Sequence, residues 1–74
     1  MRNIILRDLL NISNLEYRVF ANSNPTVFLF SNRTRGSRKA SMFMDKLVHD
    51  IAVGDGLLEI YIICDPQHPE KEVR

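Results

Sequence analysis

The sequence contains a single cysteine, Cys64, so the chain cannot form an internal disulfide bond. Small secreted domains usually need such bonds, because a short chain buries little apolar surface. Long apolar runs are missing as well. The opening residues MRNIILRDLL hold too short a run for a signal peptide, and no segment approaches the length of a membrane span. These absences favour a reducing cytoplasm, and we expect a cytoplasmic protein with no membrane partner.

An excess of one charge sign is also missing, since the chain has ten basic and nine acidic residues and a formal charge of +1. Such a balance gives no global attraction to nucleic acid or to anionic lipid. The charge is nevertheless uneven along the chain. Residues 31–46 hold five basic residues and one acidic residue, a local charge of +4, which leaves −3 for the rest. Any basic contact surface is therefore expected within this segment.

The chain has only 74 residues, which predicts one small domain with shallow pockets. A catalytic site needs several groups held by a supporting layer of side chains, and so small a core has little room for one. The residue types of a hydrolase are present, as Ser37, Ser41, His49 and Asp50. No nucleophile motif accompanies them. We therefore expect no enzymatic activity and no catalytic residue.

Three residues are candidate metal ligands, namely His49, Cys64 and His68. A structural zinc site generally has four ligands in paired spacings, and these three residues do not supply such a set. We interpret them as ordinary structural residues. The expectation is a protein without a bound metal and without a cofactor.

Apolar residues at helical spacing predict two helices. Ile5, Leu9 and Ile12 follow the spacing i, i+4, i+7, which predicts a helix over residues 4–12 with Asn3 as its cap. A second helix is expected to begin after Ser37, a suitable N-cap residue. Its predicted buried stripe consists of Ala40, Phe43, Met44 and Leu47.

Four segments have the pattern of strands. LEYRVFA (15–21) alternates between two faces, and TVFLFS (26–31) follows a turn-rich loop, so these segments predict a hairpin. VHDIAV (48–53) and LLEIYII (57–63) flank Gly54-Asp55-Gly56, which predicts a second, tighter hairpin.

The order helix, hairpin, helix, hairpin predicts an α+β fold: a four-stranded, mainly antiparallel sheet with both helices packed on one face. The expected domain covers residues 1–64. Residues 65–74 contain two prolines and one apolar residue, and they are expected to form a flexible tail.

Three phenylalanines are candidates for an exposed aromatic surface. Alternation along the strands places Phe20, Phe28 and Phe30 on the face opposite Val19. Two alternatives stay open: either the sheet is covered on both faces, or these rings form a patch that implies a homodimer or another partner.

A basic cluster is the second candidate contact surface; we define it as Arg33, Arg35, Arg38 and Lys39. Arginine can bind a carboxylate or a phosphate through two hydrogen bonds. Cations at the start of a helix oppose its macrodipole, so the cluster is slightly unfavourable for the helix that follows. Three interpretations stay open: a solvated face, a contact with a protein partner, or a contact with nucleic acid.

The pattern LRDLL … YRVF … VFLF … V-x-x-I-x-V-G-D-G-x-L-x-I-Y-I resembles small uncharacterised proteins encoded by phages and mobile elements of Gram-positive bacteria. Residues Leu6 to Leu10 and Val48 to Ile62 carry the resemblance. The segment SRKASMFMDK departs from it, because it is basic where an acidic helix is expected. The resemblance implies a phage-type protein in the cytoplasm of a bacterial host cell, and it implies no active site.

These observations lead to two hypotheses of function. The first is a non-enzymatic phage-type accessory protein that binds a host protein and inhibits a host defence system, as an anti-CRISPR protein does. The alternative is a nucleic-acid-binding module that uses the basic cluster. The expected partner-binding residues are Arg33, Arg35, Arg38, Lys39, Phe28 and Phe30.

Overall fold

The computed structural model describes residues 4–65 and Gln67. The predicted cap Asn3 and most of the predicted tail lie outside the described residues. In chain order the elements are α1 (Leu6–Ile12), β1 (Glu16–Ala21), β2 (Val27–Ser31), the 3₁₀-helix η1 (Asn32–Thr34), α2 (Arg38–Ser41), β3 (Val48–Gly54) and β4 (Leu57–Ile62).

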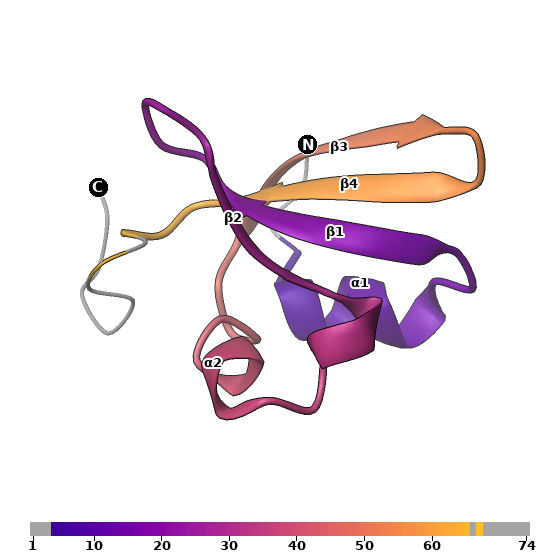
Figure 1. Cartoon of the computed structure of the whole chain (residues 1–74), viewed down its shortest axis with the longest axis horizontal. Coiled ribbons are helices and arrows are strands. Elements are labelled where there is room, and N and C mark those ends of the chain that lie inside the picture. Colours follow the sequence, from indigo (N-terminus) through magenta and orange to yellow (C-terminus); the bar gives the residue numbers. More distant parts are fainter. Residues whose placement is uncertain (1–3, 66, 68–74) are drawn as a thin grey trace.

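The four strands form one sheet in the order β2-β1-β4-β3 (Figure 1). Both predicted hairpins are present as antiparallel pairs, β1 with β2 and β3 with β4. The two hairpins join through β1 and β4, which run parallel with Val19 opposite Ile60. The α+β class with a four-stranded, mostly antiparallel sheet is therefore confirmed, with a parallel pair at its centre.

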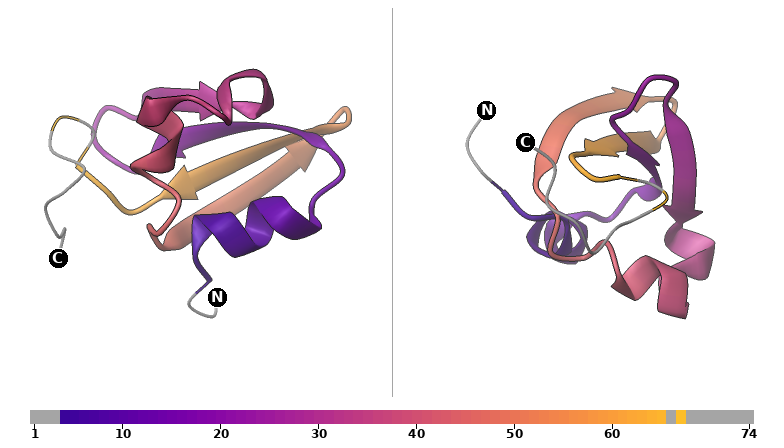
Figure 2. Two further views of the ribbon diagram at one scale, coloured as in Figure 1. Left: turned by 90° about the horizontal axis from the view of Figure 1, so that it is seen from below. Right: turned by 90° about the vertical axis from the view of Figure 1, so that its left-hand side faces the viewer.

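One hydrophobic core lies between the sheet and the helices. Leu6 and Leu10 of α1 and Ala40 of α2 are at most 2% exposed, and they belong to the same core as the inward-facing strand residues. Figure 2 shows α1 and α2 on the same side of the sheet. The strand residues of this core are Tyr17, Val19, Ala21, Leu29, Phe30, Val48, Leu58, Ile60 and Ile62. No helix in the described part of the chain has the length and apolar character needed to cross a bilayer.

A register shift in the first hairpin changes the face assignment of the phenylalanines. Val19 pairs with Phe30 and Phe20 pairs with Phe28, so β2 has one extra residue, Leu29, between the two pairs. An inserted residue reverses the alternation beyond it. Phe30 therefore shares the core face of Val19, where it is 1% exposed. The sequence prediction that Phe30 lies on the same face as Phe20 and Phe28 is wrong.

The start of α1 has no side-chain cap. Its N-cap residue is Ile5, and the helix begins at Leu6. The apolar spacing had predicted a start at residue 4. The backbone N–H groups of Leu6 and Arg7 donate instead to the carbonyl oxygens of Lys46 and Met44, each at 2.9 Å. These bonds satisfy the free donors that every helix start leaves, and they fix α1 to the segment before β3.

The second helix is shorter than the predicted stripe. Ser37 is its N-cap, as predicted, with Oγ accepting from the N–H of Ala40 at 3.1 Å. The helix ends after Ser41, and Phe43 and Met44 are buried from a turn instead. Leu47 is 40% exposed, so its predicted place in the buried stripe is wrong. It pairs with Ile5 in an isolated bridge and is thus held in extended backbone.

The second hairpin closes through a two-residue loop, Asp55-Gly56. Asp55 has φ 52° and Gly56 has φ 75°, so both residues lie in the left-handed region. Consecutive left-handed residues give the turn whose twist matches that of the flanking strands. The tight turn predicted at these glycines is confirmed.

Candidate functional site

The four residues of the basic cluster lie along one stretch of chain from η1 to α2. Arg33 belongs to η1, Arg35 to the following turn, and Arg38 and Lys39 to the first turn of α2. All four side chains are exposed. Within the described residues, none of them forms an ion pair, and only Arg35 forms a side-chain hydrogen bond.

The side chain of Arg35 reaches α1. Its Nη2 donates to Oδ1 of Asn11 at 2.8 Å. Its positive charge also acts on the hydroxyl of Tyr17, a residue that is 5% exposed. Burial raises the pKa of Tyr17, and the charge of Arg35 partly opposes this rise. Arg35 thus bridges the loop, α1 and the edge of the core.

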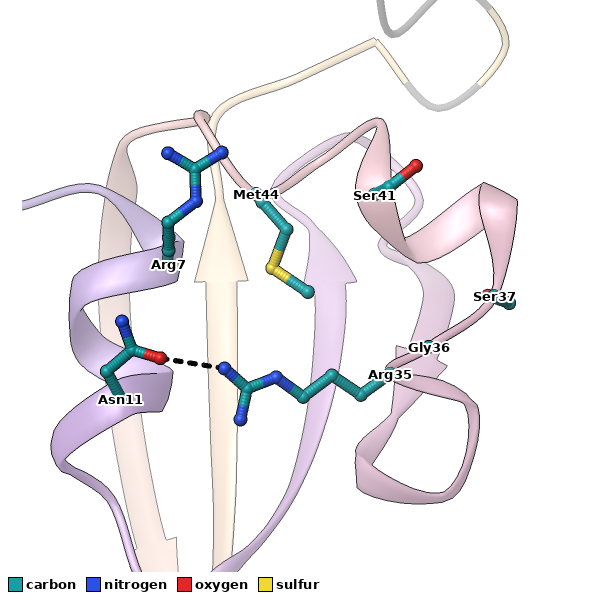
Figure 3. A pocket seen from close by; sticks show the side chains of 7 residues that line it. All are labelled: Arg7, Asn11, Arg35, Gly36, Ser37, Ser41 and Met44. Atoms are coloured by element: carbon teal, nitrogen blue, oxygen red, sulfur yellow. Dashed lines mark hydrogen bonds between the residues drawn. The ribbon is translucent and has the colours of Figure 1, made fainter.

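A groove lies between α1 and the segment that contains α2 (Figure 3). Its volume is about 550 Å³, and it is open to solvent. We call it the basic groove, because its described lining residues include two arginines and no carboxylate. The lining residues are Arg7, Asn11, Arg35, Gly36, Ser37, Ser41 and Met44.

The two walls of the basic groove are fixed relative to each other at two points. The backbone N–H of Arg7 donates to the carbonyl oxygen of Met44 at 2.9 Å. Farther along α1, Asn11 accepts the hydrogen bond from Arg35, which Figure 3 shows crossing the groove. Arg7 and Asn11 are four residues apart, so they project from the same side of α1. The groove is therefore formed before any ligand arrives.

The structure does not bring together the four residues with hydrolase chemistry. Ser37 and Ser41 line the basic groove, whereas His49 and Asp50 lie on β3. The Ser37 hydroxyl caps α2, and the Ser41 hydroxyl donates to the carbonyl oxygen of Arg38 at 2.7 Å. Asp50 Oδ1 accepts from the backbone N–H of Ile51 at 2.8 Å. Each serine hydroxyl is thus engaged with its own helix.

Of the three candidate metal ligands, the structure describes His49 and Cys64. In residues 4–65 and at Gln67, no group of three metal-ligating side chains is found. Cys64 is 4% exposed, and this burial raises the pKa of its thiol, with the charge of Lys46 acting in the opposite direction. His68 lies outside the described residues.

A second, smaller hollow of about 280 Å³ is lined by another residue of the basic cluster. Arg33 lines it together with Arg18, and Glu16 adds a carboxylate to the same hollow. Arg33 and Arg35 therefore line different depressions, although only Thr34 separates them in sequence. Two members of the predicted cluster thus lie in different hollows, Arg38 and Lys39 line neither, and of these two hollows the basic groove has no acidic residue among its described lining residues.

An aromatic row crosses the face of the sheet that points away from the helices. The centroids of Phe20 and Phe28 are 5.7 Å apart, and those of Phe20 and Tyr61 are 5.4 Å apart. These rings come from β2, β1 and β4, and Phe28 is 51% exposed. Phe30, a predicted contact residue, is not part of the row because it lies in the core. Tyr61 replaces it.

No protein-family model, curated protein or solved structure matches the chain. The site is therefore argued from its geometry. Sequence reasoning missed Arg7 and Asn11, which form the α1 side of the basic groove. Their spacing of four residues on the polar side of a predicted helix was the available signal. It gave no information on which segment lies opposite them.

Proposed function

We propose that this protein is a non-enzymatic, phage-type accessory protein that binds a host protein and thereby inhibits a host defence system. The observation that supports binding is the set of exposed cations between residues 33 and 39. In the described residues, Arg33, Arg38 and Lys39 have neither an ion pair nor a side-chain hydrogen bond. Exposed cations that form no ion pair within their own fold are suited to an acidic partner.

The placement of the aromatic residues favours a protein over a single-stranded nucleic acid. Nonspecific binding of single strands needs a basic track and aromatic rings on the same surface, so that phosphates and bases are held together. Here the basic groove lies on the helical side, and the row of Phe20, Phe28 and Tyr61 lies on the opposite face of the sheet. The balanced overall charge also gives little attraction to duplex DNA.

The test is capture of a partner from a lysate of a Gram-positive host, with and without nuclease treatment. The triple variant Arg33→Glu, Arg38→Glu, Lys39→Glu should lose a captured protein that Val53→Glu, which adds a negative charge at an exposed position of β3, retains. We expect capture to survive nuclease treatment. Expression should also raise phage plating on a host with an active CRISPR system, and the triple variant should not.

Recovery of nucleic acid alone would contradict this proposal and support the nucleic-acid-binding alternative. In that case binding should weaken steeply with salt, with a slope near the number of phosphates contacted. A doubled mass in analytical ultracentrifugation, lost on Phe28→Ala, would instead indicate a homodimer formed through the aromatic row.

A further inference from the structure

We propose that the basic groove binds an acidic segment of the partner protein, with Arg7 and Arg35 as the cationic ligands of two of its carboxylates. This inference rests on the proposed function and names the chemistry of one contact. It adds Arg7 and Asn11 to the binding surface.

The hydrogen-bonding groups of the basic groove are mainly donors. Asn11 Oδ1 already accepts from Arg35, and this bond fixes the orientation of the amide. Nδ2 of Asn11 therefore remains a free donor, and Figure 3 shows it on the side of Arg7. The Arg35 guanidinium has five N–H groups, and one of them is used by Asn11.

Arg7 adds a second guanidinium to the same groove. Its side chain has neither an ion pair nor a hydrogen bond to any described residue. No carboxylate is among the described residues that line the groove, so neither guanidinium has an acidic neighbour there. Figure 3 shows the two guanidinium groups at opposite ends of the groove, so each can bind one carboxylate of an acidic segment in a bidentate manner.

The floor of the groove favours an acidic side chain over a free inorganic anion. Met44 is 9% exposed, and Figure 3 shows its thioether chain lying between Arg7 and Arg35. A methionine can contact the methylene groups of a glutamate or aspartate while the carboxylate of that residue meets one of the arginines. An inorganic phosphate has no apolar part for this contact.

The lining also argues against a nucleotide. None of the seven lining residues is aromatic, so the groove has no surface on which a base could stack. An extended acidic peptide needs only the charges, the amide donor and the apolar floor. Because both walls are already fixed, little ordering entropy is lost when such a segment binds.

The experiment is a titration of the ¹⁵N-labelled full-length chain with an acetylated, amidated hexaglutamate peptide, followed by NMR. The largest shifts should fall on α1 and on residues 35–44. Hexaglutamine is the matched uncharged probe, and inorganic phosphate and oligo(dT) are the competing anions. We expect the dissociation constant for hexaglutamate to rise about tenfold in Arg7→Glu, a change of about 1.4 kcal/mol.

Arg18→Glu is the control variant, because it reverses an exposed charge outside the basic groove. Its affinity for hexaglutamate should change less than twofold. Arg7 is exposed, so Arg7→Glu should keep the wild-type spectrum away from α1. The proposal is overturned if hexaglutamine, phosphate or oligo(dT) binds the groove as tightly as hexaglutamate. It is equally overturned if Arg7→Glu binds hexaglutamate like the wild type.

These outcomes are distinguishable from failure of the proposed function. If the triple variant abolishes capture of a host protein but the groove ignores hexaglutamate, the function stands and the groove assignment fails. If hexaglutamate binds the groove but the lysate yields no protein partner, the groove chemistry stands and the host-protein hypothesis fails.

Discussion

The register shift in the first hairpin predicts different effects on stability for two phenylalanines that a single residue separates in the sequence. Phe30 is 1% exposed and packs edge-on against Tyr17 and in a stacked arrangement against Phe43, with centroid distances of 6.4 and 6.3 Å. Phe28 is 51% exposed. Substitution of Phe30 should therefore destabilise the protein much more than the same substitution of Phe28.

The magnitudes follow from burial. Removing a fully buried phenylalanine leaves a cavity, so Phe30→Ala should lower the free energy of unfolding by about 3–5 kcal/mol. Phe28 buries about half of its ring, roughly 100 Å², which at about 25 cal/mol per Å² gives an upper bound near 2.5 kcal/mol. Because the denatured chain is itself compact, we expect about 1–2 kcal/mol for Phe28→Ala.

Urea unfolding followed by circular dichroism is the assay, since the chain has no tryptophan. The whole domain is expected to have a stability of about 4–11 kcal/mol, so Phe30→Ala could be largely unfolded. The milder pair avoids this problem: Phe30→Leu should cost about 1–2 kcal/mol and Phe28→Leu about 0.5 kcal/mol or less. The register shift would be refuted if the two alanine variants, or the two leucine variants, lost the same free energy of unfolding with the same slope against urea concentration. Strict alternation in β2 would then be the better description.

Three further predictions test local features. Gly56→Ala should cost about 1–2 kcal/mol because Gly56 has φ 75°, whereas Gly54→Ala, at a position without a positive φ, should be close to neutral; thermal unfolding compares them. Ser37→Ala should cost about 1 kcal/mol through loss of the cap on α2, and Ser41→Ala, whose hydroxyl bonds only a carbonyl of its own helix, should cost less in the same assay. Burial raises the pKa of the Cys64 thiol. The neutral thiol therefore contributes its full stabilisation below the ordinary thiol pKa of about 8.5, and this contribution is lost as the pH rises from there through the raised pKa of the folded state. Unfolding free energies measured from pH 7 to 10.5 should fall less steeply in Cys64→Ala, and parallel curves would contradict this assignment.

Local chemistry in the sequence determined the elements and several of their ends. Ser37 caps α2, and the Asp55-Gly56 loop closes the second hairpin, because capping oxygens and left-handed turn residues act within a few positions of the chain. The apolar spacing of Ile5, Leu9 and Ile12 indicated the helix α1, but the residues that α1 buries are Leu6 and Leu10, and Ile12 is 74% exposed. For the candidate site, the sequence indicated the cations of the basic cluster but not their arrangement.

The tertiary structure alone decided which distant segments meet. The parallel pairing of β1 with β4 joins residues 41 positions apart in the sequence, and nothing in either strand encodes that neighbour locally. The register shift at Leu29 moved Phe30 into the core because packing against Phe43 outweighed strict alternation. The basic groove exists because backbone bonds from α1 to residues 44 and 46 bring Arg7 opposite Arg35. Spacing along a chain can place side chains on one face of one element, but only packing between elements can set two charges in the same groove.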